Sequence, residues 1–467
     1  MMKRMDFMEE IYMQTLNSKA EKRAFYRLLL VLALPIVLQN LIDACVGAAD
    51  TFMLNYVSQD ALAAVSLANN VQFINNMFLL GLCSGASVLI AQYWGRGDMR
   101  TIERTIGITM RLALIVGAVF SLATIVAPAQ VMRIFTNDSR MIPIGADYLR
   151  IVGVGYLINA FTQVYVSAQR AMEKVRFGVA VNLAALLTNV VLNACFIFGL
   201  AFFPKLDVIG VAIATAISRV VAAAICALHA CRPSPVRLRV KYLFEKNPEL
   251  FRDYAKYTLP ALGNDFAWGL GFSAYSMILG HLNADCVAAN SYANTLRNLS
   301  TVICFAVANA AAIIMGKSMG ENRLEDANVY AKRLTVLSAI TGVAAGAGVL
   351  IASPFLLSFA KITPQAKEYL KWMLLISIPN VFGQSMNTML ICGIYRAGGD
   401  TKFGMIVDLF TMWVYGVALG SLAAFVLKLP VIAVYAVMFM DELVKLPFVA
   451  KHYAARGWLK NITREMN

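Results

Sequence analysis

The sequence predicts an all-α integral membrane protein with twelve transmembrane helices in two six-helix lobes related by a parallel internal repeat. Three observations predict this fold. Of the 467 residues, 59% are hydrophobic and only 15% are charged, against roughly 25% charged in ordinary globular domains. Apolar stretches of about 20 residues, each long enough to cross a hydrocarbon core as a helix, recur along the whole chain. The second half of the chain also repeats the pattern of the first.

The basic residues predict the orientation in the membrane. The chain carries 41 Lys and Arg and a net charge of +14. Most of these residues fall in the loops that are cytoplasmic when the N-terminus is cytoplasmic, as the positive-inside rule requires. We therefore expect a multi-pass protein of the cell membrane with both termini in the cytoplasm. The basic joint RPSPVRLRVKYLFEKNPELFRDYAK is expected to contact anionic membrane lipids rather than nucleic acid.

The repeat emerges when the sequence is aligned with itself. At an offset of 225, LPIVLQNLIDACVGAAD matches LPALGNDFAWGLGFSAY, which pairs Pro35 with Pro260. QRAMEKVRFGVAVN matches YRAGGDTKFGMIVD at an offset of 226, and LDVIGVAIATAISR matches LPVIAVYAVMFMDE at 223. Six helices per half give both halves the same orientation. The expected domains are an N-lobe over residues 1–235, a cytoplasmic basic linker over 236–254 and a C-lobe over 255–467.

The first apolar segment contains two acids. In LIDACVGAADTFML, Asp43 and Asp50 stand two helical turns apart on one face. Insertion scales assign a charged group within a membrane roughly 2.5 to 3.5 kcal/mol, so each one needs a reason. A carboxylate without a cationic neighbour in a low dielectric is a ready proton carrier or cation ligand. Pro35 and Pro260 interrupt the first helix of each half, and we expect them to act as hinges.

Polar residues at helical spacing mark several later helices. They either join helices by hydrogen bonds or face a binding site. On the expected fourth and fifth helices these polar residues are Asn159, Gln163, Asn189 and Asn193. On the helices of the second half they are Asn294, Gln384 and Asn387. Arg219 and Glu442, at equivalent positions of the two halves, suggest an ion pair between helices in each lobe.

The first helix of the second half combines an acid with aromatic residues. Asp265, Trp268, Phe272 and Tyr275 form one stripe, and a carboxylate beside ring faces suits an organic cation. The alternative is that the rings serve packing. Arg297 on the next helix is a candidate ion-pair partner that would neutralise Asp265. Elsewhere, Asp408 lies close enough to the start of its helix to reach cytoplasmic water.

Several motifs, taken in order, resemble one known family. LALPIVLQNLIDACVGAADTFML, ALAAVSLAN, AQYWGRGD, GVAIATAISR, YRAGGDTKFG and DELVK are similar to the multidrug and toxic compound extrusion (MATE) transporters, a resemblance that extends from about Arg27 to Trp458. It implies a bacterial antiporter of the multidrug/oligosaccharidyl-lipid/polysaccharide flippase superfamily, exporting organic, mostly cationic, drugs in exchange for H+ or Na+. Such a protein is not an enzyme, needs no cofactor and is expected to be a monomer. The alternative is a flippase for lipid-linked sugars or other lipids, which would need a strongly cationic cavity.

The resemblance also implies the residues that bind the coupling ion. In the family, the coupling aspartate stands fifteen residues after the first-helix proline, as Asp50 does here. It acts with an asparagine and a threonine, matched by Asn189 and Thr215. Asp43 is a candidate second ligand.

Two further positions leave the coupling ion open. Val46 and Asn193 replace a tyrosine and a second aspartate of proton-coupled members, and Trp268 replaces a glutamate of sodium-coupled members. Asp43 would then compensate for the acid missing at Asn193. The one metal site that the resemblance implies is a sodium ion at Asp50.

Overall fold

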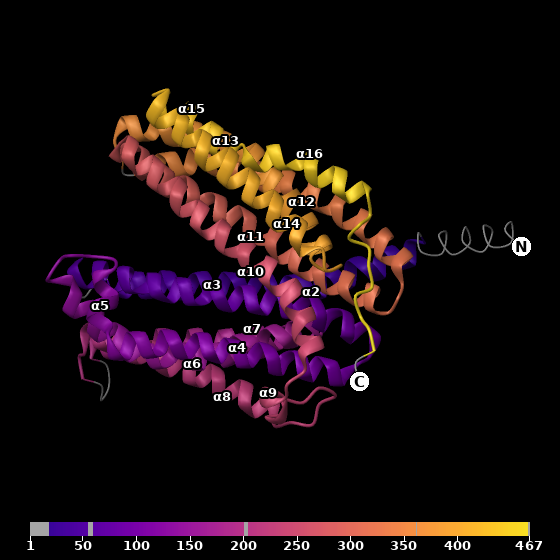
Figure 1. Ribbon diagram of the computed structural model, residues 1–467. Coiled ribbons are helices and arrows are strands. Elements are labelled where there is room, and N and C mark those ends of the chain that lie inside the picture. Colours follow the sequence, from indigo (N-terminus) through magenta and orange to yellow (C-terminus); the bar gives the residue numbers. More distant parts are fainter. Residues whose placement is uncertain (1–17, 55–58, 200–203, 361, 466–467) are drawn as a thin grey trace, which may run out of the picture. The chain divides into compact units, whose positions relative to one another are not determined.

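The computed structural model describes residues 18–54, 59–199, 204–360 and 362–465, without the side chains of residues 43–60. Over this part of the chain the secondary structure is helical and no strand occurs (Figure 1). Nine of the described helices are long and apolar enough to cross a membrane. Together with the helices that are more polar or interrupted, they are consistent with twelve membrane spans. The predicted all-α membrane fold is therefore confirmed.

The described chain forms two compact units. The N-terminal unit comprises Leu38–Leu262 and Glu465–Asn467, and the C-terminal unit comprises Met1–Val37 and Gly263–Arg464. The boundaries therefore fall inside two helices, α2 (Lys19–Leu54) and α10 (Pro248–Leu282). Each boundary lies two residues after a matched proline, Pro35 or Pro260. The first arm of each of these helices thus belongs to the unit that contains the other half of the repeat.

The N-terminal unit is built around α6, which packs against α3, α4, α7 and α8. Its helices are α3 (Gln59–Arg96), α4 (Met99–Val126), α5 (Pro128–Arg133), α6 (Met141–Ala171), α7 (Val175–Phe198), α8 (Asp207–Ala230) and α9 (Lys241–Phe244). The ends follow local chemistry. Asp98 accepts a hydrogen bond from the Thr101 amide at the start of α4, and Gly199 ends α7 at a left-handed φ of 65°.

The C-terminal unit is built around α13, which packs against α11, α12, α15 and α16. Its helices are α11 (Ala284–Gly320), α12 (Leu324–Phe359), α13 (Pro364–Thr388), α14 (Thr401–Leu409), α15 (Val431–Phe439) and α16 (Asp441–Ala454), with π-helical turns η1 (Met389–Tyr395), η2 (Phe410–Leu419) and η3 (Leu422–Val426). The break between α15 and α16 at Met440 and the π-helical turns distinguish this unit. Irregular backbone of this kind is frequent at functional sites in membrane helices.

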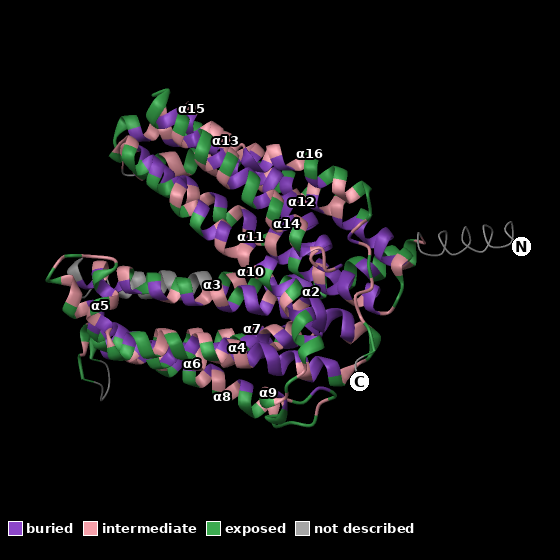
Figure 2. Cartoon of the chain, viewed as in Figure 1, coloured by how far each residue is buried: buried purple, intermediate pink, exposed green. Residues whose placement is uncertain are grey.

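The distribution of side chains is that of a membrane protein. Figure 2 shows buried and exposed residues alternating along the same long helices. After its first turns, which expose Glu325 and Lys332, α12 exposes only apolar residues among its large side chains: Val336, Ile340, Val343, Leu350, Ile351, Phe355 and Phe359. Many amides, hydroxyls and charges are buried instead. Apolar residues outside and hydrogen-bonded polar residues inside are the expected arrangement for helices surrounded by lipid.

One glycine pair brings two helices of the N-terminal unit together. A Cβ at Gly85 of α3 would lie 2.4 Å from the Cα of Thr258 in α10, and one at Gly81 would lie 2.8 Å from the Cα of Leu262. Gly81 and Gly85 form a GxxxG pattern, which permits close backbone approach. The hydroxyl of Tyr254 also donates to the Leu82 carbonyl at 3.1 Å. These contacts attach the first arm of α10, including Pro260, to α3.

Candidate functional site

The N-terminal unit contains a chain of buried amides. The Asn193 side chain of α7 donates to Asn189 Oδ1 at 3.1 Å, and Asn189 donates to Thr215 Oγ1 of α8 at 3.3 Å. All three residues are buried. The structure thus brings together the three predicted ion-coupling residues of the fifth and sixth membrane helices. Their role in coupling stays a prediction.

Asp43 and Asp50 stand on α2, but their side chains lie outside the described residues. A nearby contact shows how α2 is held. Arg170 at the end of α6 donates to Gln39 Oε1 at 3.0 Å. In the second half, Arg396, the counterpart of Arg170, contacts Asp265 of α10, one residue after the counterpart of Gln39. The internal repeat is therefore visible in contacts as well as in sequence.

The remaining polar candidates of the N-terminal unit differ in exposure. Asn159 of α6 donates to Asn76 Oδ1 of α3 at 3.2 Å and is partly exposed. Gln163, one turn later, is exposed. Asn159 thus joins two helices, while Gln163 is accessible.

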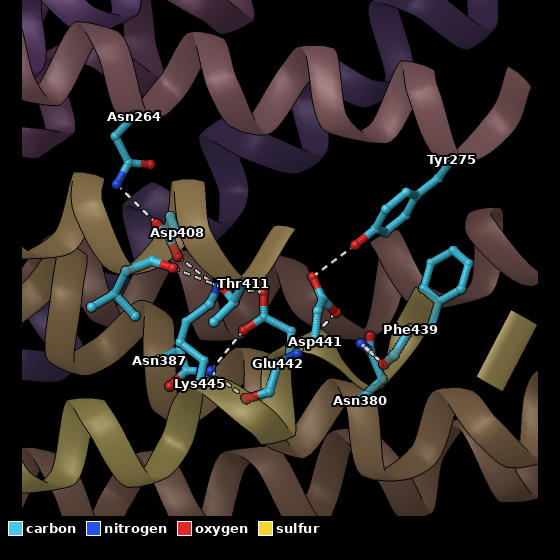
Figure 3. Close-up of polar contacts among 11 residues, drawn as sticks. Asn264, Tyr275, Asn380, Asn387, Asp408, Thr411, Phe439, Asp441, Glu442 and Lys445 are labelled. Carbon is cyan, nitrogen blue, oxygen red and sulfur yellow. Dashed lines mark hydrogen bonds and ion pairs between the residues drawn. The ribbon is translucent and has the colours of Figure 1, made fainter. Parts of the chain in front are cut away.

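The C-terminal unit contains a buried cluster of charges where α14 meets α16 (Figure 3). The ammonium of Lys445 lies 2.6 Å from Asp408 Oδ1 and 3.0 Å from Glu442 Oε1. Asn264 of α10 donates to the other Asp408 oxygen at 2.8 Å. Asn387 of α13 donates to the Glu442 carboxylate at 2.7 Å. The Lys445 side chain is 3% exposed, so these charges interact in a medium of low dielectric.

A third carboxyl adjoins this cluster without contacting the lysine. Figure 3 shows the Tyr275 side chain of α10 pointing at Asp441. The Tyr275 hydroxyl donates to Asp441 Oδ2 at 3.1 Å, and the Glu442 amide donates to Asp441 Oδ1 at 2.8 Å. The approach of Tyr275 depends on Gly416 of η2, because a Cβ there would lie 1.8 Å from the hydroxyl.

Amide side chains of α13 stabilise the break in the twelfth membrane helix. Asn380 donates to the Phe439 carbonyl at 2.6 Å, and Asn387 donates to the Glu442 carbonyl at 2.7 Å. Backbone groups released by a helix break must find other donors and acceptors inside a membrane protein. The break therefore has built-in hydrogen-bond donors, and it makes Asp441 the first residue of α16.

Three expectations about charged side chains are corrected. Asp265 contacts Arg396, at 3.4 Å, rather than Arg297. Arg297 instead donates to Asn294 on its own helix and lies over an aromatic ring, with its guanidinium carbon 4.4 Å from the centroid of Phe439. Arg396 stands in the turn that follows η1 and Arg297 stands within α11, so the choice of partner depends on how these segments pack against α10.

The other two corrections concern Asp408 and the expected pairing of Arg219 and Glu442. Asp408 is buried against Lys445 and does not extend toward the cytoplasm. Arg219 donates to the Val152 carbonyl and lies over the Tyr156 ring, so its described contacts are to α6 backbone and an aromatic ring rather than to an acid. Glu442 does form an ion pair, but with Lys445 of its own helix.

The aromatic stripe of α10 is continuous. Trp268 and Phe272 meet edge to face at 4.5 Å between centroids, and Phe272 meets Tyr275 at 6.0 Å. Trp268 and Phe272 are partly exposed, whereas Tyr275 is buried. Among the other substrate candidates, Asn294 is partly exposed, and Gln384 and Asn387 are buried.

Sequence reasoning missed the central position of Lys445 and the separate environment of Asp441. The signal was present in MDELVK, where two acids and a lysine fall within one and a half turns of an apolar helix. In the part of the chain that the structure describes, no group of three His, Cys, Asp or Glu residues has the arrangement of a metal site.

Comparison with known proteins identifies the family. The family model described as MatE matches residues 35–195 and 260–422, once in each half. The chain belongs to the MatE family. The matched segments begin at Pro35 and Pro260, so the family pattern contains the repeat found in the sequence. The resemblance to MATE transporters is confirmed.

Relatives and solved structures agree with this assignment. The chain is 21% identical over 454 residues to the uncharacterized transporter YisQ of Bacillus subtilis, covering 97% of this chain and 99% of that protein. It is 24% identical over 441 residues to the probable multidrug resistance protein NorM of Thermotoga maritima, covering 94% of both. A crystal structure of MATE in the bent conformation matches with a TM-score of 0.83 at 19% identity, covering 92% of this chain and 96% of that one. This MATE transporter therefore has the established fold of its family, a family of transporters and not of enzymes.

Proposed function

We propose that this MATE transporter is a secondary active efflux antiporter that exports organic, mostly cationic, compounds in exchange for H+ or Na+ by alternating access. The observation that carries the proposal is the division of the chain. Both boundaries between the compact units fall two residues after a matched proline. Proline removes a backbone hydrogen bond and permits bending. Pro35 and Pro260 are therefore suited to act as hinges.

We infer that ion coupling in the N-lobe centres on Asp50, with Asn189, Asn193, Thr215 and Asp43 as further ligands. The bonded chain from Asn193 to Thr215 supports this inference, because it is buried and made of groups that orient a cation or a protonated acid. Ion and drug need only prefer different conformations, or compete for one carboxylate, for their movements to be coupled.

We place the organic cation near the accessible part of the α10 stripe. Asp265, Trp268 and Phe272 are partly exposed and combine two ring faces with one carboxylate, which an organic cation would share with Arg396. Accessible amides add hydrogen-bonding groups: Asn159, Gln163 and Asn294. Tyr275, Gln384 and Asn387 are buried, and we assign them a supporting role around the cavity.

The proposal includes the cellular setting. Basic residues in the connecting segments favour a cell-membrane protein with both termini in the cytoplasm, in contact with membrane lipids. We expect this transporter to act as a monomer without a cofactor. The flippase alternative is not favoured. Among similar proteins, several carry the name of a probable multidrug resistance protein, and Lys445 and Arg396 are paired with acids rather than left to form a cationic cavity.

The test is dye efflux from everted membrane vesicles, driven separately by a proton gradient and by a sodium gradient. Wild-type protein should drive efflux with at least one of the two. Asp50→Asn should abolish ion-driven efflux, because the amide cannot bind and release a proton or balance the charge of Na+. Membrane insertion and folding should be unchanged.

The matched control is Asp147→Asn, which removes an exposed acid of α6 in the same unit. This variant should transport like the wild type. Full efflux in Asp50→Asn would contradict the assignment of the coupling residue. No efflux from wild-type vesicles under either gradient would contradict the antiporter itself.

A further inference from the structure

The buried cluster of the C-terminal unit has more acids than bases. Asp408, Glu442 and Asp441 lie together with one ammonium group, that of Lys445. Lys445 contacts both Asp408 and Glu442. Asp265 does not change this charge difference, because it forms an ion pair with Arg396. The cluster thus holds more negative charge than its lysine can neutralise.

Among the described residues, Asp441 is the carboxyl of the cluster that no cation contacts within ion-pair distance. Its described contacts are the Tyr275 hydroxyl of α10 and the Glu442 amide of α16, both uncharged donors. Arg297 of α11 faces the same region, but its guanidinium lies over the rings of Phe439 and Phe272, at 4.4 and 5.6 Å from their centroids. It forms no ion pair with a described acid.

The cluster has an excess of negative charge even if Arg297 is counted as part of it, because three acids would then face two bases. The charged and titratable groups around Asp441 are Tyr275 from α10, Arg297 from α11, Asp408 from α14, Tyr435 from α15, and Glu442 and Lys445 from α16. The helix α13 contributes only uncharged amides, Asn380 and Asn387. An uncompensated carboxylate in a low dielectric is costly, and the group avoids that cost by binding a proton.

The internal repeat gives this acid a counterpart in the other half. Tyr275 stands 225 residues after Asp50, the offset that aligns the two prolines. Asp441 stands 223 residues after Ser218, the offset that aligns the sixth and twelfth helices. The N-lobe therefore has its acid on the first helix and a hydroxyl on the sixth. The C-lobe has the hydroxyl on the first helix, Tyr275, and the acid on the last.

The local backbone also fits a group that changes its charge. Asp441 is the first residue of α16, at the break that Asn380 and Asn387 stabilise. The Tyr275 hydroxyl and the Glu442 amide donate hydrogen bonds that favour the ionised carboxylate, whereas burial favours the neutral carboxyl. The surroundings of Asp441 therefore act on its charge in opposite directions.

We propose that Asp441, hydrogen-bonded by Tyr275, binds and releases a proton during transport, so that the C-lobe holds a second coupling site. This inference rests on the proposed antiport function and specifies H+ as the ion at this site. One O–H bond forms when the proton enters, and the same bond breaks when the proton leaves to water. Deprotonation adds one negative charge to the C-lobe, which favours the state that holds an organic cation.

The experiment is a pH titration of the purified full-length protein in lipid nanodiscs, followed by infrared difference spectroscopy. A protonated carboxyl has a carbonyl stretch that an ionised one lacks. In the wild type this band should fall as pH rises. In Asp441→Asn the band should lose the intensity of one carboxyl, and the protein should take up one proton fewer over the titration. An unchanged band and unchanged proton uptake would overturn the proposal.

A second variant keeps the acid in place. Tyr275→Phe removes the hydroxyl that donates a hydrogen bond to the Asp441 carboxyl, so the titration midpoint of the Asp441 band should move. The matched control is Glu368→Gln, which removes an exposed acid at the start of α13 and should leave the midpoint unchanged. A midpoint unmoved in Tyr275→Phe would also count against Asp441.

The outcome is independent of drug transport. Proton-driven export of ethidium from proteoliposomes tests the antiporter, and the infrared titration tests the residue. Efflux in the wild type with an unchanged band in Asp441→Asn would remove only this proposal. A band that depends on Asp441 in a protein that does not export ethidium would support the proton site but contradict the proposed antiport function.

Discussion

At the scale of single residues, the C-terminal unit depends on one buried lysine. Lys445 is within ion-pair distance of two acids on two different helices, α14 and α16. A buried ion pair adds little net stability over an apolar core, but removing one member leaves an uncompensated charge. Lys445 therefore adds little net stability itself, but its removal would leave the buried carboxylates of Asp408 and Glu442 without a counter-ion.

Lys445→Met tests this asymmetry. The methionine has a similar volume but no charge, so Asp408 and Glu442 would be buried without a counter-ion. We expect the free energy of unfolding to fall by about 3 to 5 kcal/mol, measured by denaturant titration in lipid–detergent micelles. The double variant Lys445→Met/Asp408→Asn should recover part of the loss. Equal stability of the wild type and Lys445→Met would show that the lysine is not a required counter-ion.

At the scale of helices, close backbone approach fixes the first arm of α10. A Cβ at Gly85 would lie 2.1 Å from the hydroxyl and 2.4 Å from the Cα of Thr258. The backbone atom cannot rotate away, so one helix must move. We expect Gly85→Ala to lower the free energy of unfolding by about 1 to 3 kcal/mol, as overpacked sites do. The matched control is Gly348→Ala in α12, where no neighbouring atom lies within 4 Å. Similar stabilities in both variants would contradict the close contact.

Helices, repeat and matched prolines were predictable from the sequence because hydropathy and spacing are local properties. The break at Met440 was not. MFMDELVK contains neither glycine nor proline, and the break depends on donors from α13, Asn380 and Asn387, that are distant in sequence. The pairing of Asp265 with Arg396 was also missed, because it depends on how the turn after η1 packs against α10. In the N-lobe, the spacing of Asn189 and Asn193 placed both on one helical face, and the structure shows that they bond to each other there.

At the scale of the whole molecule, the two compact units exchange helix arms. The arm of α2 up to Val37 belongs to the C-terminal unit, and the arm of α10 up to Leu262 belongs to the N-terminal unit. Contacts in each unit hold these arms. Phe25 of α2 stacks on Tyr330 of α12 at 4.7 Å between centroids, and Tyr254 of α10 bonds to α3. Because each arm is held in one unit, a movement of one unit relative to the other must bend α2 and α10 just beyond the prolines.

Pro35→Ala and Pro260→Ala test this conclusion. Alanine restores a backbone donor and stiffens the helix, so each variant should bind ethidium as the wild type does but turn over more slowly. The double variant should be slowest. Turnover is measured in proteoliposomes and binding by fluorescence anisotropy. The matched control is Pro354→Ala in α12, a helix proline that lies within one unit; it should leave turnover unchanged. Equal turnover in all four variants would mean that the prolines are not the hinges, and that bending takes place elsewhere along α2 and α10.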